Sequence, residues 1–209
     1  MNTAMIRSPR KRKGHGGERH QEILDAALAL ISQRGVLAVS TRDIASAVGI
    51  SQPALYAYFA TRDDIMAELC EQAFAALSHR LQAVGGMPPG RLSLRMMCQA
   101  YINFGLENPN AYRVAFMIEK PVDPAHLDAA SERALSAGVR TYGVFRTEIA
   151  RFSAAGLTRD ADLDILTQSA WASLHGLVSL MIARPHFPWV DQSRLVEAHI
   201  EQLIDAMMA

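Results

Sequence analysis

The 209-residue chain has few aromatic residues, two cysteines and no net charge. Aromatic residues make up 7% of it, and the abundance of alanine, leucine and methionine favours helices over strands. Cys70 and Cys98 lack metal-type spacing and fit buried small apolar residues better than a disulfide. No apolar run of about eighteen residues exists, so no membrane-spanning helix is expected. The basic N-terminus also lacks the apolar segment of a secretory signal.

Sequence motifs of common catalytic sites are also missing. The chain contains no HExxH metal pair, no phosphate-binding loop, no dinucleotide fingerprint and no nucleophile elbow. An enzyme would have to draw on isolated groups, namely His79, His175, His186, His199, Cys70 and Cys98. None of these cysteines and histidines forms a known local motif. We therefore predict no catalytic residues, no metal site and no cofactor.

The neutral total charge conceals an asymmetry along the chain. Residues 1–62 hold nine Lys and Arg against four Asp and Glu, whereas the remaining residues hold twelve against seventeen. A basic N-terminal unit on an acidic body indicates nucleic-acid contact at one end only. Residues 1–16 are polar, basic and glycine-rich, and we expect a mobile arm there. This arm is either a solvated tail or a basic extension that lies on phosphates or in a minor groove.

Residues 40–59 carry the most informative pattern, which is two short helices joined by a tight turn. Ser40 and Asp43 have capping-box spacing at the start of the first helix. Gly49 can adopt the left-handed conformation that ends this helix. Ser51 then caps a second helix, and Pro53 lies in its first turn, where no backbone N–H is required.

The second of these helices has two distinct faces. Leu55 and Phe59 are spaced to point into a core, while a polar and small-residue face remains outside: Gln52, Ala54, Tyr56 and Tyr58. This arrangement is typical of a helix-turn-helix whose second helix enters the major groove of DNA. The alternative is a helical hairpin without a nucleic-acid role, because short motifs also arise by chance.

The remainder of the chain is also helical in pattern. Apolar periodicity, glycines and prolines predict helices over residues 17–34, 62–84, 90–106, 109–119, 124–155, 159–183 and 192–207. Four side chains are placed as N-caps: Asn108, Asp123, Thr158 and Asp191. We therefore expect an all-α fold. A mobile basic arm (1–16) precedes a three-helix helix-turn-helix domain (17–62) and a larger C-terminal helical domain (63–209).

The first 65 or so residues resemble the TetR family of bacterial transcriptional regulators. The likeness rests on Glu22–Ala27, Arg34-Gly35, Ser40–Ala45, Val48–Ser51, Leu55–Phe59 and Arg62–Ile65. Tyr58 departs from the family, which often has histidine there, but tyrosine can still donate to a phosphate. Arg62 stands where lysine is common, so the charge is kept. Two later segments, Asn108–Arg113 and Trp171–Gly176, are similar to one class of TetR-type ligand domains that has a Trp-xxx-His-Gly element.

The resemblance implies a homodimer that reads double-stranded DNA with a palindromic operator. Its two recognition helices would enter successive major grooves, about 34–36 Å apart. By position, Gln52, Pro53 and Ala54 would meet base edges. The phosphate contacts would come from Thr41, Arg42, Tyr56, Tyr58 and Arg62, helped by backbone N–H groups at helix starts such as the one Ser51 caps.

The resemblance also implies a repressor in the bacterial cytoplasm that a small-molecule effector releases from DNA. An apolar or aromatic ligand is favoured, because methionine suits adaptable binding surfaces and no charged cluster lies in this half. The candidate pocket residues are Met97, Tyr101, Phe104, Phe116, Met117, Tyr142, Phe145, Trp171 and His175. The alternative is that these side chains are core and that His175 is paired inside the bundle, with Gly176 allowing close helix packing.

Dimerisation would use the last two helices, as in the family. The expected surface consists of Leu166, Ala170, Leu174, Leu177 and Met181, facing Leu195, His199, Leu203 and Met207. The C-terminal half has a second interpretation. The protein would be a DNA-binding regulator without a small-molecule switch, controlled by its abundance or by a protein partner. A closed apolar cavity in the C-terminal half would distinguish the two.

Overall fold

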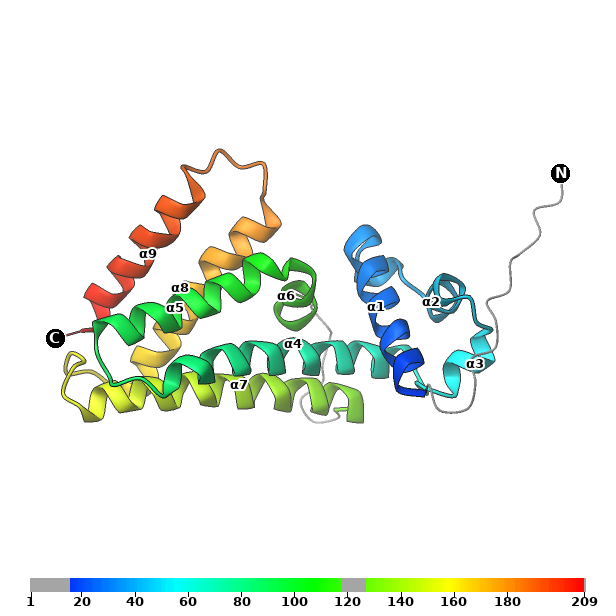
Figure 1. The fold of residues 1–209 in the computed structure, drawn as a ribbon, viewed down its shortest axis with the longest axis horizontal. Coiled ribbons are helices and arrows are strands. Elements are labelled where there is room, and N and C mark those ends of the chain that lie inside the picture. Colours follow the sequence, from blue (N-terminus) through cyan, green and yellow to red (C-terminus); the bar gives the residue numbers. More distant parts are fainter. Residues whose placement is uncertain (1–15, 118–126, 209) are drawn as a thin grey trace.

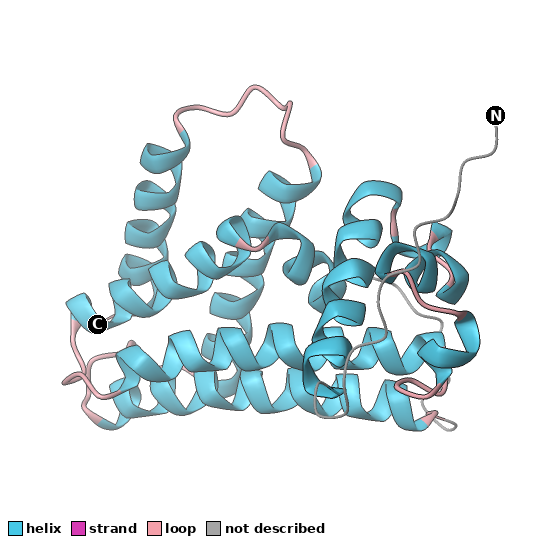
Figure 2. Cartoon of the chain, turned by 45° about the vertical axis from the view of Figure 1, so that its right-hand side comes forward, coloured by secondary structure: helices cyan, strands magenta, loops and turns pink. Residues whose placement is uncertain are grey.

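The computed structural model describes residues 16–117 and 127–208, and most of them lie in helices (Figure 2). The helices are α1 (Gly16–Arg34), α2 (Thr41–Val48), α3 (Gln52–Tyr56), α4 (Arg62–Gly85), α5 (Arg91–Glu107), α6 (Pro109–Phe116), α7 (Ala129–Ala154), α8 (Leu163–Ala183) and α9 (Gln192–Met207). A 3₁₀ turn, η1 (Val36–Ala38), joins α1 to α2. Over the described residues the only β pairing is an isolated bridge between Thr158 and Met208. The expectation of an all-α fold is confirmed.

Helices α1 to α3 form a compact head whose turns follow the capping residues in the sequence (Figure 1). The Ser40 hydroxyl accepts from the Asp43 amide at 3.2 Å, and the Asp43 carboxylate accepts from the Ser40 amide at 2.9 Å. Gly49 ends α2 with φ of 71°, in the left-handed region that favours glycine. The Ser51 hydroxyl accepts from the Ala54 amide at 3.3 Å and so begins α3. The predicted helix-turn-helix geometry is thus confirmed.

Helix α4 is the structural link between the head and the body. It starts beneath the head with a capping box between Thr61 and Asp64 and ends at Gly85, as the sequence predicts. Helix α7 lies alongside α4, while α5 and α8 pack on them and α9 returns against α5 (Figure 1). Any displacement of the first turns of α4 must therefore move the head relative to the body.

Two apolar cores lie on either side of this link. The body core is built mainly from α5, α8 and the far half of α4, together with side chains of α7 and α9. The head core continues beyond residue 62, because Ile65 and Leu69 of α4 and Val114 of α6 belong to it. The head is consequently anchored on both α4 and α6.

Two helices begin later than their sequence pattern predicts. Helix α7 starts at Ala129, where the Asp128 carboxylate accepts from the Ser131 amide at 2.7 Å. The expected cap, Asp123, lies outside the described residues. Helix α8 starts at Leu163 rather than near residue 159, because the Asp162 carboxylate accepts from the first-turn amides. An aspartate directly before the apolar period thus caps each helix.

Helix α6 is shorter than expected and begins without a side-chain cap. It ends at Phe116, and the residues after Met117 that were expected to extend it lie outside the described ones. Asn108 precedes Pro109 as predicted, but its side-chain amide donates to the Phe104 carbonyl at 3.0 Å. This asparagine therefore closes α5 instead of capping α6. The prediction for Asp191 is confirmed, since its carboxylate accepts from the Arg194 amide at 2.9 Å.

The apolar stripe expected to form the dimer surface faces the interior of its own chain instead. Its members on α8 are each at most 8% exposed and pack inside the body of their own chain: Leu166, Ala170, Leu174, Leu177 and Met181. On α9, Met207 is buried as well, and Leu195, His199 and Leu203 are half-buried. The stripe is the monomer core because α8 packs on α5 through it. The exposed face of α8 carries Ile165 and Leu180 instead, whose side chains are 67% and 54% exposed.

Helix α8 is also unusually apolar for a helix with so much free surface. It has 21 residues, a mean hydropathy of 1.3 over its most apolar stretch, and only 39% of that stretch buried. By length and composition alone α8 would be able to span a bilayer. No such helix was expected from the sequence, because the chain has no uninterrupted apolar run of that length. Core helices of other proteins meet the same criterion. Its exposed apolar side chains leave a face that another surface can cover.

Candidate nucleic-acid interface and ligand pocket

Three polar side chains meet on the outer face of the head, between the start of α2 and α3. The Gln52 amide donates to the Thr41 hydroxyl at 3.0 Å and to the Tyr56 hydroxyl at 3.2 Å. Thr41 and Tyr56 are themselves 3.4 Å apart through their oxygens. The sequence placed Gln52 and Tyr56 on one helix face and assigned Thr41 a phosphate contact, and the structure brings all three into one hydrogen-bonded cluster. Such a cluster holds the Gln52 side chain in a defined position before any ligand arrives.

Tyr56 is the exposed member of this cluster, with 46% of its surface accessible. Hydrogen bonds with Thr41 and then with Gln52 hold the pKa of its phenol below the ordinary value. Its oxygen lies at the rim of the helix-turn-helix, where a phenol can donate to a phosphate oxygen. Tyr58, two residues further on, is 38% exposed.

Thr41, by contrast, is buried at 9% exposure, whereas the neighbouring residues expected on this face are accessible. Arg42 and Pro53 are exposed, Ser51 is exposed at the cap of α3, and Ala54 is half-buried. The first-turn amides of α2 and α3 lie beside them, each next to a serine cap. The face therefore offers a guanidinium, hydroxyls and backbone N–H groups around a short helix. These are the donors that a phosphate backbone requires.

Arg62 behaves differently from the other predicted phosphate contacts. Its Nε donates to the Val39 carbonyl at 2.8 Å, and its Nη2 donates to the Val36 carbonyl. The side chain is half-buried and ties the first turn of α4 to the segment between α1 and α2. A contact with phosphate remains a prediction, but the structure gives this arginine a task inside the protein.

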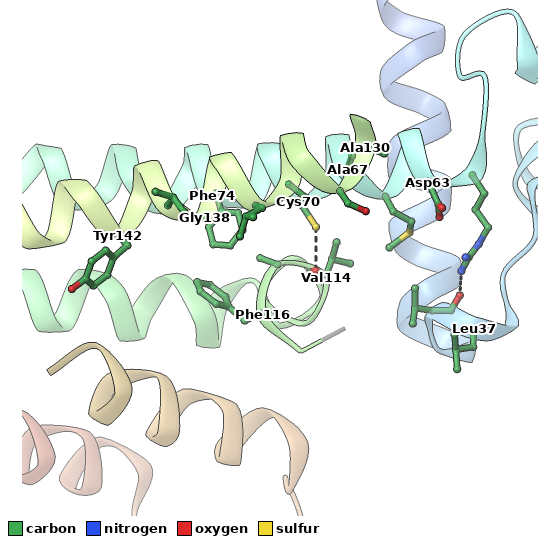
Figure 3. A pocket seen from close by; sticks show the side chains of 18 of the residues that line it. Leu37, Asp63, Ala67, Cys70, Phe74, Val114, Phe116, Ala130, Gly138 and Tyr142 are labelled. Carbon is green, nitrogen blue, oxygen red and sulfur yellow. Dashed lines mark hydrogen bonds between the residues drawn. The ribbon is translucent and has the colours of Figure 1, made fainter. Parts of the chain in front are cut away.

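A pocket of about 560 Å³ lies between α4, α6 and α7 (Figure 3). Its volume falls within the usual range for small-molecule sites, and its walls are mostly apolar. Phe74 and Phe116 line its middle, while Tyr142 lies towards one end and Leu37 at the other. The Tyr142 oxygen is buried and has no hydrogen-bond partner among the described residues. The pocket thus extends from the body to the 3₁₀ turn of the head.

The candidate pocket residues divide into two groups. Phe116, Tyr142 and Trp171 line the pocket. The others do not line it: Met97, Tyr101, Phe104, Met117, Phe145 and His175. Four of these, Met97, Tyr101, Phe104 and Phe145, are at most 2% exposed and belong to the body core. The alternative interpretation, an aromatic core, therefore holds for them. Helix α5, which carries the first three, packs on both α4 and α8, and α7, which carries Phe145, packs on the same two helices.

His175 is paired inside the bundle, as the alternative interpretation had it. Its Nδ1 lies 2.8 Å from the Tyr112 hydroxyl, which in turn lies 3.1 Å from that of Tyr101. Burial lowers the pKa of His175 below its ordinary value. The neighbouring Gly176 does not allow close packing within the described chain, since an added Cβ there meets nothing within 4 Å. Gly105 has this role instead, because its Cβ would lie 2.9 Å from the Tyr112 ring.

Sequence reasoning missed the small residues that leave room for the pocket. Ala130, Ala134 and Gly138 recur every four residues on the face of α7 that lines it, and Ala67 lines it from α4. A Cβ on Gly138 would lie 3.2 Å from the Phe74 ring, so glycine allows the close approach of that ring. A stripe of small residues ahead of Tyr142 was the available signal.

Among residues 16–117 and 127–208, no three His, Cys, Asp or Glu side chains are grouped as metal ligands would be. Cys98 is fully buried, and this burial raises the pKa of its thiol to about 12. A thiol in that environment stays protonated at neutral pH and is a poor nucleophile.

Comparisons with known proteins agree with the geometry of the head and body. Residues 23–69 match the profile described as "Bacterial regulatory proteins, tetR family", and residues 94–207 match "Tetracyclin repressor-like, C-terminal domain". The nucleoid occlusion factor SlmA of Glaesserella parasuis is 28% identical over 115 residues, which are 54% of this chain and 56% of that protein. The regulator AcrR of Shigella flexneri is 42% identical over 62 residues, 30% of this chain and 29% of its own.

The chain thus spans about half or less of the length of these curated relatives. Among solved structures, the TetR family transcriptional regulator PfmR from Thermus thermophilus has a TM-score of 0.72 and 21% identity. The match covers 88% of this chain and 97% of that one, and it shows a shared fold. With both profiles matched and the helix-turn-helix in place, the chain belongs to the TetR family of bacterial regulators, which are DNA-binding proteins rather than enzymes.

Proposed function

We propose that this TetR-family regulator is a homodimeric repressor that a small, mostly apolar ligand releases from a palindromic operator. The observation that carries the proposal is the pocket of about 560 Å³, whose apolar walls connect the body with the head. A ligand there is positioned to affect both. As a protein that binds the chromosome, it would act in the bacterial cytoplasm.

The DNA-facing part of the proposal rests on the outer face of α2 and α3. Gln52, Pro53 and Ala54 would meet base edges, and Gln52 is the main candidate for reading sequence. Thr41, Arg42, Ser51, Tyr56 and Tyr58 would hold phosphates and so fix the register. Arg62 would bind phosphate only through N–H groups that do not already donate to the carbonyls of Val36 and Val39.

The ligand-facing part rests on the lining of the pocket. Phe74, Phe116 and Trp171 supply aromatic walls, which suits a flat or chain-like apolar molecule. The unpartnered hydroxyl of Tyr142 favours a ligand with one hydrogen-bonding group, because a buried polar atom without a partner is costly. The proposed domain division at residues 17–62 and 63–209 puts the pocket at the junction, where Ile65 and Leu69 of α4 still pack in the head core.

Dimerisation would use the exposed face of α8 together with α9. Ile165, Ala172 and Leu180 are exposed on α8, and Gly176 has open space around it. Large apolar side chains with small residues between them allow two copies of a helix to approach closely. A dimer of this kind would place two heads on one side of the assembly, as a palindromic operator requires.

The proposal is tested by operator binding in the presence of apolar compounds. The purified protein selects its site from genome fragments, and fluorescence anisotropy then measures operator affinity with each compound. An effective compound should lose its effect on Ala134→Trp, which fills the pocket, and keep it on Ala76→Trp, an exposed position on α4 outside the pocket. Equal loss in both variants would contradict the pocket assignment.

The competing reading is a regulator without a small-molecule switch. It predicts that no compound alters operator affinity, and that Ala134→Trp binds the operator as the wild type does. The pocket is partly open to solvent and reaches the head, so it is not the closed cavity of the C-terminal half that would decide between the two readings. Its size and apolar lining favour the switch.

A further inference from the structure

The pocket crosses the boundary between the body and the DNA-binding head. From the body it is lined by α6 and α7, including Phe116 and Gly138. From the head it is lined by Val36 and Leu37 of η1, and Arg62 and Asp63 in the first turn of α4 line the same end. Leu37 and Asp63 are seen at this end in Figure 3. A molecule that fills it therefore touches the head itself.

Leu37 is the clearest sign that something can cover the head end of the pocket. It is 92% exposed, although it is a large apolar side chain on the rim of an apolar cavity. Across the pocket, Leu135 of α7 is 56% exposed. Covering both removes apolar surface from water, which favours an occupant that reaches this end.

Arg62 connects this end of the pocket to the DNA-facing residues. Its bonds to the carbonyls of Val36 and Val39 hold η1 and the chain just before α2 against α4. Val39 directly precedes Ser40, the residue that caps α2. Thr41 follows, and its hydroxyl accepts from Gln52. A short covalent and hydrogen-bonded path thus leads from the pocket wall to the recognition helix.

We propose that the occupant of this pocket contacts the head directly, and that Arg62 is the positioning residue through which occupancy changes the DNA-facing side chains. This inference rests on the proposed function. The occupant has an apolar body and an end that lies against Leu37 and Arg62. It weakens DNA binding because it favours an arrangement in which Arg62 no longer holds both carbonyls.

Thermodynamics sets what such a ligand must do. It shifts the protein only if it binds the DNA-free arrangement more tightly than the DNA-bound one. If a pocket ligand weakens operator binding by some factor, the operator must weaken ligand binding by the same factor. This factor measures the coupling between pocket and operator. Operator affinity alone does not, because losing a direct phosphate contact of Arg62 would also lower it.

The test uses 1-anilinonaphthalene-8-sulfonate as a fluorescent probe of the purified 209-residue protein. Its affinity is measured with and without saturating operator DNA, and the ratio of the two is the coupling factor. Ala134→Trp serves to establish that the signal comes from the pocket. Arg62→Met keeps the aliphatic stem and removes the donors, and Arg42→Met is the matched control on the same head, away from the pocket.

The wild type should give a coupling factor of about 5- to 150-fold. Arg62→Met should bind the probe and lower the factor to about one, whereas Arg42→Met should weaken operator binding and keep the wild-type factor. Leu37→Ser changes an exposed side chain and so tests the same contact without risk to folding. It should also reduce the factor.

The possible outcomes distinguish a failure of the role of Arg62 from a failure of the proposed ligand switch. A wild-type factor retained in Arg62→Met and Leu37→Ser would overturn the role of Arg62 and leave the proposed function intact. A factor of one in the wild type, with the probe in the pocket, would overturn the ligand switch and this inference together. A probe signal that Ala134→Trp does not remove would contradict the pocket as the binding site.

Discussion

Replacing Gln52 by alanine should relax base choice at one position of each half-site. In the structure both N–H groups of its amide are already engaged, with Thr41 at 3.0 Å and Tyr56 at 3.2 Å. A bidentate contact with adenine contributes about 1–3 kcal/mol of discrimination. Because Gln52 must give up internal hydrogen bonds of about 0.5–1.5 kcal/mol each, we expect the lower end of that range.

The expected discrimination is about 1 kcal/mol for each half-site, or about fivefold. Two half-sites in a dimer give about 2 kcal/mol, or roughly thirtyfold, between the best operator and one changed symmetrically at that base. The assay is fluorescence anisotropy on four sequences, the operator and its three symmetric variants at the contacted base. Gln52→Ala should bind the four with nearly equal affinity, and the wild type should not.

Arg42→Ala is the matched control for this measurement. Arg42 is exposed beside the same cluster, and removing a side chain that binds phosphate should weaken all four operators equally. It should also reduce the dependence of log affinity on log salt concentration by about one for each phosphate that is no longer neutralised. Equal weakening of all sequences by Gln52→Ala would refute base reading and make Gln52 a backbone contact.

Three further predictions concern the body of the protein. Gly105→Ala should lower the free energy of unfolding by about 1–3 kcal/mol in urea titrations, because the added Cβ collides with α6 and α8. Gly143→Ala, which has open space around it, should raise that free energy by up to about 1 kcal/mol. Burial lowers the pKa of His175, so the unfolded chain takes up a proton first. The free energy of unfolding should therefore fall as the pH drops below about 6.5, and less so in His175→Gln. Leu180→Glu, on the exposed face of α8, should yield a folded monomer in ultracentrifugation, whereas Leu174→Glu, which is fully buried, should unfold the chain; a dimeric Leu180→Glu would refute the interface.

The head was predictable because its determinants are local. Ser40 with Asp43, Gly49 and Ser51 each act within four residues, so spacing alone places two helices and their turn. The same reasoning misplaced the starts of α7 and α8. Several residues there can serve as caps, and the aspartate nearest the apolar period, Asp128 or Asp162, is the one that does.

The pocket was less predictable because it depends on contacts between distant segments. Periodicity identified an aromatic cluster, but it did not tell which side of α5 faces the core and which residues line a cavity. Tyr101 and Phe145 proved to be core, whereas Ala134 and Gly138 line the pocket by being small. Arg62 looked like a phosphate contact from its position, and only the fold reveals its bonds to the carbonyls of Val36 and Val39.

The central claim is that a dimer reads a palindrome with the outer face of α2 and α3. The most direct measurement is a genome-fragment selection with the wild type and with the double variant Arg42→Ala and Gln52→Ala, followed by a salt titration on the best site. The account predicts a palindromic site for the wild type, with half-sites about one helical turn or a multiple apart and a steep salt dependence, and no enrichment by the variant. No enriched site at low salt, or the same site enriched by the variant, would contradict it.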